Sequence, residues 1–120
     1  MQQPDVTLTV RQLGPSVAAI DVHGDITGAA EEALIRAYAE ASAPTTRSII
    51  LNFSGLTYMN SVGIGLLVTL LIRMKRQQQS LLAYGLSDHY RHIFQLTALD
   101  QAIVLTATEA DAVRAAAHLP

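Results

Sequence analysis

The stretch NFSGLTYMNSVGIGLL, residues 52–67, joins one apolar segment to the start of another through a short polar interval. Asn60 and Ser61 stand at the junction, with two glycines close behind them. Asparagine and serine are among the preferred residues at the N-cap of a helix, where a side-chain oxygen accepts a hydrogen bond from a free backbone N–H. An apolar run with helical spacing follows, so we predict a helix that begins at about Ser61 and ends near Gln78.

Two interpretations of Ser61 remain open at this point. In the first, Ser61 only caps the helix. In the second, its hydroxyl is modified, because a helix N-terminus offers free N–H donors and a partial positive charge that favour an anion. A phosphate there would add a charge of roughly −1.5 to −2. Gly63 and Gly65 also have two interpretations: they let the helix pack tightly on a neighbouring strand, or they leave room for another molecule.

Two common phosphate and nucleophile motifs are absent around these residues. The sequence contains no G-x-x-x-x-G-K-[ST], so the glycines do not form a phosphate-binding loop of that type. It contains no G-x-S-x-G, so Ser61 does not lie in a nucleophile elbow. The rest of the sequence offers no constellation of residues that supports catalysis either, so we expect no catalytic residue and no enzymatic activity.

Strand and helix patterns alternate along the rest of the chain. The segments GDITGA and SGLTYMN are expected to interrupt or follow strands as loops. The first two strands should form an antiparallel hairpin, and the later alternation predicts an α/β fold, a mixed sheet with parallel pairs and right-handed crossovers. The expected strands are 6–10, 17–22, 48–53, 80–85 and 102–106, and the expected helices are 28–43, 61–78, 87–99 and 108–119.

The helix over residues 61–78 carries apolar side chains at helical spacing, which predicts one face buried in the core. The expected buried stripe consists of Ile64, Leu67, Val68, Leu71 and Ile72.

Composition narrows the class of protein. The chain has 120 residues, half of them apolar, which suits one domain with a buried core. The net charge of −2 disfavours a nucleic-acid partner, and the absence of cysteine excludes disulfides and thiolate metal sites. The N-terminal ten residues lack the pattern of a signal peptide, and no apolar run is long enough to span a membrane. We expect a cytoplasmic protein with no direct membrane insertion.

Three segments resemble the STAS family of anti-sigma factor antagonist domains. LTYMNSVGIGLL is similar to the family's aromatic-Met-Asp-Ser-small-Gly-Leu-Gly stretch before a long helix. VHGDIT and LSDHYRHIFQLTALDQAIVL resemble two further family elements. The resemblance implies that residues 1–120 form a single STAS domain, with a small mixed β-sheet and helices packed mainly on one side.

The resemblance also implies a function in transcription regulation by partner switching. Family antagonists bind an anti-sigma factor that is also a serine kinase, which then phosphorylates the serine at the position of Ser61. A PP2C-type phosphatase resets the protein, no cofactor or metal is required, and a homo-oligomer is one possible assembly. The partner-binding residues implied by the family motif are Asp25, Thr27, Asn60, Ser61, Val62, Gly63 and Gly65.

This sequence departs from the family pattern at three positions. Asn60 stands where the family usually has aspartate, and Val62 where serine or threonine is frequent. Ala98 replaces a usual glycine, which we interpret as a packing variation. The uncharged Asn60 favours the alternative function, a structural or adaptor STAS domain in a sensory assembly or a lipid-transport ABC complex. His89 and His92 share a predicted helix but are too few to predict a metal site.

Overall fold

The computed structural model describes residues 5–119. Residues 1–4 and Pro120 lie outside the described part. They include the start of the N-terminal segment that was compared with a signal peptide, and both ends of the predicted 1–120 domain. The elements in chain order are β1 (Val6–Gln12), β2 (Val17–Ile26), η1 (Gly28–Ala30), α1 (Glu31–Ala41), β3 (Ser48–Met59), α2 (Ser61–Arg76), β4 (Ser80–Tyr84), α3 (Asp88–Leu96), η2 (Leu99–Gln101), β5 (Val104–Thr106) and α4 (Glu109–Ala117).

The strands form a single five-stranded sheet in the order β1-β2-β3-β4-β5. β1 and β2 are an antiparallel hairpin, and β2, β3, β4 and β5 pair in parallel. The predicted mixed sheet and the predicted hairpin are both confirmed.

β2 and β3 are longer than the sequence pattern predicted, and much of the two segments expected as loops is strand. Residues 24–26 and 54–59 are strand, because β2 and β3 continue to pair as far as Ile26 opposite Met59, whereas Thr27 is a loop residue and η1 begins at Gly28. Glycines inside these segments serve the sheet itself. Gly24 has a φ of 104° beside a register shift, and a Cβ on Gly55 would lie 2.3 Å from the ring Nδ1 of His23. Glycine here marks a bulge and a close contact within strands, not a turn.

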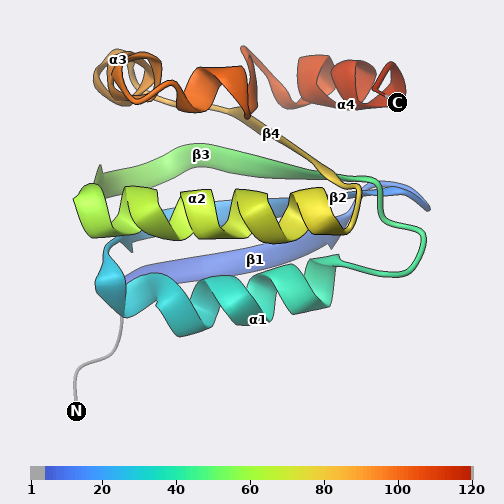
Figure 1. The fold of residues 1–120 in the computed structure, drawn as a ribbon, viewed down its shortest axis with the longest axis horizontal. Coiled ribbons are helices and arrows are strands. Elements are labelled where there is room, and N and C mark those ends of the chain that lie inside the picture. Colours follow the sequence, from blue (N-terminus) through green and yellow to red (C-terminus); the bar gives the residue numbers. More distant parts are fainter. Residues whose placement is uncertain (1–4, 120) are drawn as a thin grey trace.

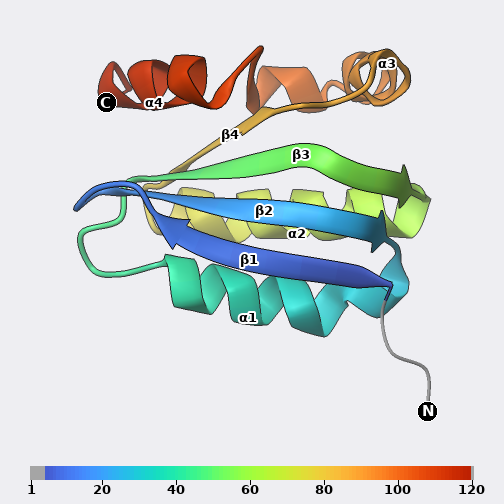
Figure 2. The ribbon, with the colours of Figure 1, turned by 180° about the vertical axis from the view of Figure 1, so that it is seen from behind.

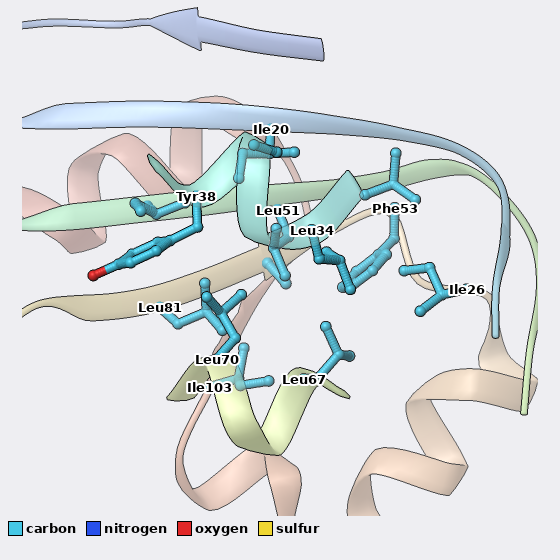
Figure 3. Close-up of a cluster of buried hydrophobic side chains, with 14 of the residues drawn as sticks. Ile20, Ile26, Leu34, Tyr38, Leu51, Phe53, Leu67, Leu70, Leu81 and Ile103 are labelled. Carbon is cyan, nitrogen blue, oxygen red and sulfur yellow. The ribbon is translucent and has the colours of Figure 1, made fainter. Parts of the chain in front are cut away.

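Helices α1 and α2 lie side by side over one face of the sheet, and the view from behind shows β1, β2 and β3 in front of α2 (Figures 1 and 2). The main core forms between them, where Ile20 and Leu51 of the sheet face Leu34 of α1 and Leu67 of α2 (Figure 3). α3 joins the same core through Phe94, whose ring meets Phe53 edge-on with centroids 6.2 Å apart.

α4 packs on the opposite face, where Ala112 contacts a small apolar cluster of Ala19, Ile50 and Leu82. The predicted packing of helices mainly on one side is therefore confirmed, and α4 is the exception.

The buried face of α2 differs from the predicted stripe. The buried residues are Gly63, Leu67, Leu70 and Met74, which recur at spacings of four, three and four. Val68 and Ile72 were expected in the core but are exposed by 39% and 50%. The apolar residues of this helix are so numerous that they cover more than one face, so the period alone could not locate the core side.

The predicted helix over residues 87–99 is interrupted. α3 ends at Leu96 and η2 starts at Leu99, with Ala98 between them in the left-handed region at a φ of 59°. Ala98 is therefore more than a packing variation, because a backbone in the left-handed region favours glycine.

Candidate functional site

The start of α2 is capped by Asn60 and not by Ser61. Asn60 has an extended backbone, with φ −104° and ψ −178°, and its Oδ1 accepts a hydrogen bond of 2.9 Å from the N–H of Gly63. Ser61 is the first residue inside the helix. The interpretation of Ser61 as the cap is therefore wrong, because the preceding residue holds that position.

Ser61 is exposed at the N-terminal end of α2. Within residues 5–119, none of the side-chain hydrogen bonds involves its hydroxyl. The first turn of a helix leaves N–H groups without partners inside the helix, and Asn60 satisfies one of them. Ser61 is thus an accessible hydroxyl beside further donors and the positive end of the helix dipole.

Gly63 and Gly65 have different roles. A Cβ on Gly63 would lie 2.0 Å from the carbonyl oxygen of Ile26, and that same oxygen accepts the N–H of Asn60 at 3.3 Å. Tight packing of α2 on the end of β2 therefore requires glycine at position 63. Gly65 is exposed, and a Cβ there would meet no atom within 4 Å. For Gly65 the packing interpretation is wrong, and the open-space interpretation remains.

The loop between β2 and η1 lies beside the start of α2. Thr27 caps η1 by accepting the N–H of Ala29 at 3.3 Å. A Cβ on Gly28 would lie 3.3 Å from Cγ1 of Val62, a side chain that is itself 56% exposed. The structure thus brings Thr27 next to the helix start that carries Asn60 and Ser61.

Asp25 is less directly connected to this group. It lies near the end of β2, where its N–H donates to the carbonyl oxygen of Asp5 at 2.8 Å and its Cα pairs with Tyr58 of β3. Among the described residues, no hydrogen bond or ion pair joins its carboxylate to Asn60 or Ser61. Of the predicted site residues, Thr27, Asn60, Ser61, Val62 and Gly63 therefore gather around Ile26, Gly65 follows them along α2, and Asp25 stands apart.

A polar network on the opposite face of the sheet was missed by the sequence analysis. The guanidinium of Arg11 donates to Asp21 through Nε at 2.7 Å and through Nη2 at 2.9 Å, and to Glu109 at 2.6 Å. Asn52 donates to the same Asp21 carboxylate at 2.9 Å. The available signal was that these polar residues occupy alternate positions of adjacent strands, which places them on one face.

The network sets the electrostatics of this face. Hydrogen bonds from Arg11 hold the pKa of Asp21 below its ordinary value, against the opposing effect of burial. The same bonds to Asp21 and Glu109 raise the pKa of Arg11. The Asp21 carboxylate is held ionised and paired, so it is not available to move a proton. Through the bond from Arg11 to Glu109, the network links α4 to the sheet.

No group of three or more potential metal ligands occurs among residues 5–119. His89 and His92 are both exposed on α3. In the same part of the chain, none of the helices has the length and apolar character needed to cross a membrane.

Comparison with known proteins places this arrangement in a family. The family model described as "Mlab, STAS domain" matches residues 9–107. An anti-sigma-B factor antagonist of Staphylococcus aureus is 35% identical over 54 residues, which cover 45% of this chain and 50% of that protein. The alignment thus spans only half the length of the curated relatives it matches.

Solved structures agree on the fold. An anti-sigma factor antagonist from Mycobacterium paratuberculosis has a TM-score of 0.79 at 23% identity, covering 98% of this chain and 99% of that one. The antagonist SpoIIAA is similar in its unphosphorylated form, with a TM-score of 0.69 at 20% identity and coverage of 94% and 100%. Its phosphorylated form, from Bacillus, has a TM-score of 0.61 at 23% identity and coverage of 90% and 97%. With the family match over most of its length and this shared fold, the chain belongs to the STAS domain family.

Proposed function

We propose that this chain is an anti-sigma factor antagonist, which binds an anti-sigma factor and is released when that partner, a serine kinase, phosphorylates Ser61. One observation carries the proposal. Asn60 caps α2, so the exposed Ser61 hydroxyl stands at the helix start with no structural task among the described hydrogen bonds. The named relatives support it, since they are anti-sigma factor antagonists and one of them was solved in a phosphorylated form.

The binding surface we propose comprises the helix start and the adjoining loop. Val62 is 56% exposed, and Gly65 leaves open space beside it. A partner can approach the backbone closely there, so a phosphate on Ser61 would place a charge of roughly −1.5 to −2 inside the contact. That charge would have to lose water or repel the partner, and either effect weakens the complex. The proposed surface consists of Asp25, Thr27, Asn60, Ser61, Val62, Gly63 and Gly65.

The proposal also includes the removal of the phosphate and the place in the cell where this cycle of phosphorylation occurs. A PP2C-type phosphatase would remove the phosphate and restore binding, and the cycle would take place in the cytoplasm, where sigma factors act. The protein itself would contribute no catalytic group and no cofactor.

Phosphorylation by the cognate kinase with ATP tests the proposal on Phos-tag gels. We expect wild type to shift completely and Ser61→Ala not to shift. Thr57→Ala removes another exposed hydroxyl near the same end of β3 and should behave as wild type. If wild type and Ser61→Ala give the same result, shifted or unshifted, the proposal fails.

A second candidate is an adaptor STAS domain that never carries phosphate, in a sensory assembly or a lipid-transport ABC complex. The uncharged Asn60 favours it, because the family's aspartate is missing beside the hydroxyl. Co-purification of a membrane ATPase or of a high-mass assembly, together with phosphorylation of Asn60→Asp but not of wild type, would select this candidate.

A further inference from the structure

The outer surface of α2 carries several exposed apolar side chains, and Ile35 of the neighbouring α1 is exposed as well. The large hydrophobic side chains exposed in residues 5–119 are Ile35, Tyr58, Val62, Val68, Ile72, Leu96, Val104 and Val113. Three of these belong to α2 and one, Ile35, to α1, while the others are scattered over four elements. A concentration of this kind on one surface marks an interaction site, whereas single exposed apolar residues need no explanation.

A groove runs between these two helices, which lie side by side in Figure 1. It encloses about 90 Å³, less than the ~150 Å³ of a cavity that holds benzene and far less than a drug-sized site. The groove therefore suits one or two apolar side chains of a larger partner. Its lining consists of Glu31, Leu34, Ile35 and Tyr38 from α1, and of Leu66, Thr69, Leu70 and Arg73 from α2.

The two ends of the groove carry opposite charges. Glu31 lies at the end where α1 and α2 begin, and Arg73 lies seven residues beyond Leu66, with its guanidinium 6.0 Å from the centroid of the Tyr38 ring. Neither charge takes part in an ion pair within the described residues. Glu31 and Tyr38 are seven residues apart on α1, which is about 10 Å of helix, so Glu31 and the Arg73 beside Tyr38 bracket roughly two helical turns.

We propose that this groove binds a single amphipathic α-helix of the partner protein, running antiparallel to α1 and α2. An acidic residue near the N-terminus of that helix faces Arg73, and a basic residue near its C-terminus faces Glu31. Its apolar side chains, at spacings of three and four, enter the hollow and cover Ile35 and Ile72. The proposal rests on the partner-binding role proposed above, because Val62 and Gly65 continue the same surface of α2 toward Ser61.

Two physical arguments fix this orientation. Acidic residues stabilise a helix at its N-terminus and basic residues at its C-terminus, so the charges that complement the groove also suit the bound helix. The dipoles of α1 and α2 point the same way, since both helices begin at the same end of the sheet (Figure 1). The dipole of an antiparallel third helix interacts favourably with both of these dipoles. Side chains at positions i, i+3 or i+4, and i+7 of that helix would enter the groove.

A pair of synthetic peptides tests occupant and orientation together. Both are blocked helical 15-residue peptides with the same leucine stripe; one has glutamates first and lysines last, and the other has the reverse order. In fluorescence anisotropy at low salt we expect the first to bind about three- to tenfold more tightly, from two partly exposed charge contacts. The double variant Glu31→Lys with Arg73→Glu should invert the preference.

Matched apolar variants locate the binding surface. Ile35→Asp and Ile72→Asp alter side chains exposed by 49% and 50%, and we expect at least a tenfold loss of peptide affinity with folding intact. Leu96→Asp alters a side chain of α3 that is 73% exposed and should change nothing. Equal affinity for both peptides, or equal losses in all three variants, would overturn the proposal. So would a shift from dimer to monomer on Ile35→Asp in sedimentation, because a second copy would then occupy the groove.

These results are separable from the phosphorylation test. Peptide binding in the groove without any phosphorylation of Ser61 would contradict the proposed switch and support the proposed helix-binding groove. Phosphorylation of Ser61 without peptide binding would contradict the proposed helix-binding groove and support the proposed switch.

Discussion

At the scale of single residues, the start of α2 divides two tasks between neighbours. In this protein Asn60 supplies the capping oxygen, so nothing in the helix start depends on the hydroxyl of Ser61. A phosphate added to Ser61 would not displace the cap. A substitution of Asn60 can therefore change the stability of the helix start without removing the Ser61 hydroxyl, and a modification of Ser61 can leave the cap in place.

Asn60→Ala tests the cap directly. Loss of the 2.9 Å bond to the N–H of Gly63 should lower the free energy of unfolding by about 1 kcal/mol. Asn60→Asp keeps the acceptor and adds a negative charge beside the helix N-terminus, so it should match or exceed wild type by ~0.3–1 kcal/mol. Urea unfolding at pH 7 measures both. The cap assignment would be contradicted if Ser61→Ala cost as much as Asn60→Ala.

Ala98 adopts a backbone conformation that suits glycine better than alanine. At a φ of 59° its Cβ crowds the backbone, which costs roughly 1–2 kcal/mol. Glycine removes that strain but loses more entropy on folding, about 0.5–1 kcal/mol. We expect Ala98→Gly to raise the free energy of unfolding by about 0.5–1 kcal/mol in urea titrations. A destabilisation would show that the methyl group contributes more by packing than it costs by strain.

At the scale of elements, α2 carries two glycines with opposite purposes, and alanine distinguishes them. Gly63→Ala would place a methyl 2.0 Å from the carbonyl oxygen of Ile26, so we expect a loss of about 1–3 kcal/mol. Gly65→Ala meets no atom within 4 Å and improves helix propensity, so we expect a gain of about 0.5–1 kcal/mol.

Gly65→Ala should also weaken binding of the proposed anti-sigma factor partner, because the added methyl projects from the proposed surface. Isothermal titration measures that affinity, and urea unfolding measures the stability. A variant that is more stable and binds unchanged would show that the partner does not approach Gly65.

The order of the strands and of the α-helices followed from the sequence, but the ends of β2 and β3 and the break after α3 did not. Alternation and consecutive apolar residues identified every strand, because burial on one or both faces leaves that pattern. The C-terminal halves of β2 and β3 carry glycines whose tasks depend on a neighbouring strand: Gly55 makes room for the ring of His23. A constraint imposed by a residue 32 positions away is not visible in a local window.

For the candidate site, too, the local sequence was informative and the long-range contacts were not. Motif residues marked the start of α2, and the predicted helix start at Ser61 is confirmed. Which neighbour caps the helix depended on a backbone angle at Asn60, and the roles of Gly63 and Gly65 depended on where α2 crosses β2. The alternating polar positions of the strands hinted at the Arg11 network, but the contact with Glu109, 98 positions away, could not be predicted.

At the scale of the whole molecule, the Arg11 network connects the first and last elements that the structure describes, β1 and α4. It joins β1, β2 and β3 to the first residue of α4, which is the helix that packs alone on its face of the sheet. The side chain of Arg11 is 37% exposed and that of Asp21 is 16% exposed, so water screens the pairing only in part. The network should therefore contribute to global stability in a way that depends on pH.

Arg11→Met tests that dependence. The pKa of Asp21 is lowered in the folded state from an ordinary value of 3.8, so the pairing stabilises the protein above about pH 4 and loses this effect as the pH falls through the folded value. We expect Arg11→Met to be less stable by about 1 kcal/mol at pH 7, with the difference shrinking as the pH falls from 4 toward 2. Arg114→Met is the matched control, because the Arg114–Asp111 pair lies on the exposed side of α4 and should contribute little at any pH. Urea unfolding of the three proteins across this range gives the comparison. A difference between wild type and Arg11→Met that stays constant from pH 7 to pH 2 would mean that Arg11 stabilises the sheet by packing its stem and not through its charge.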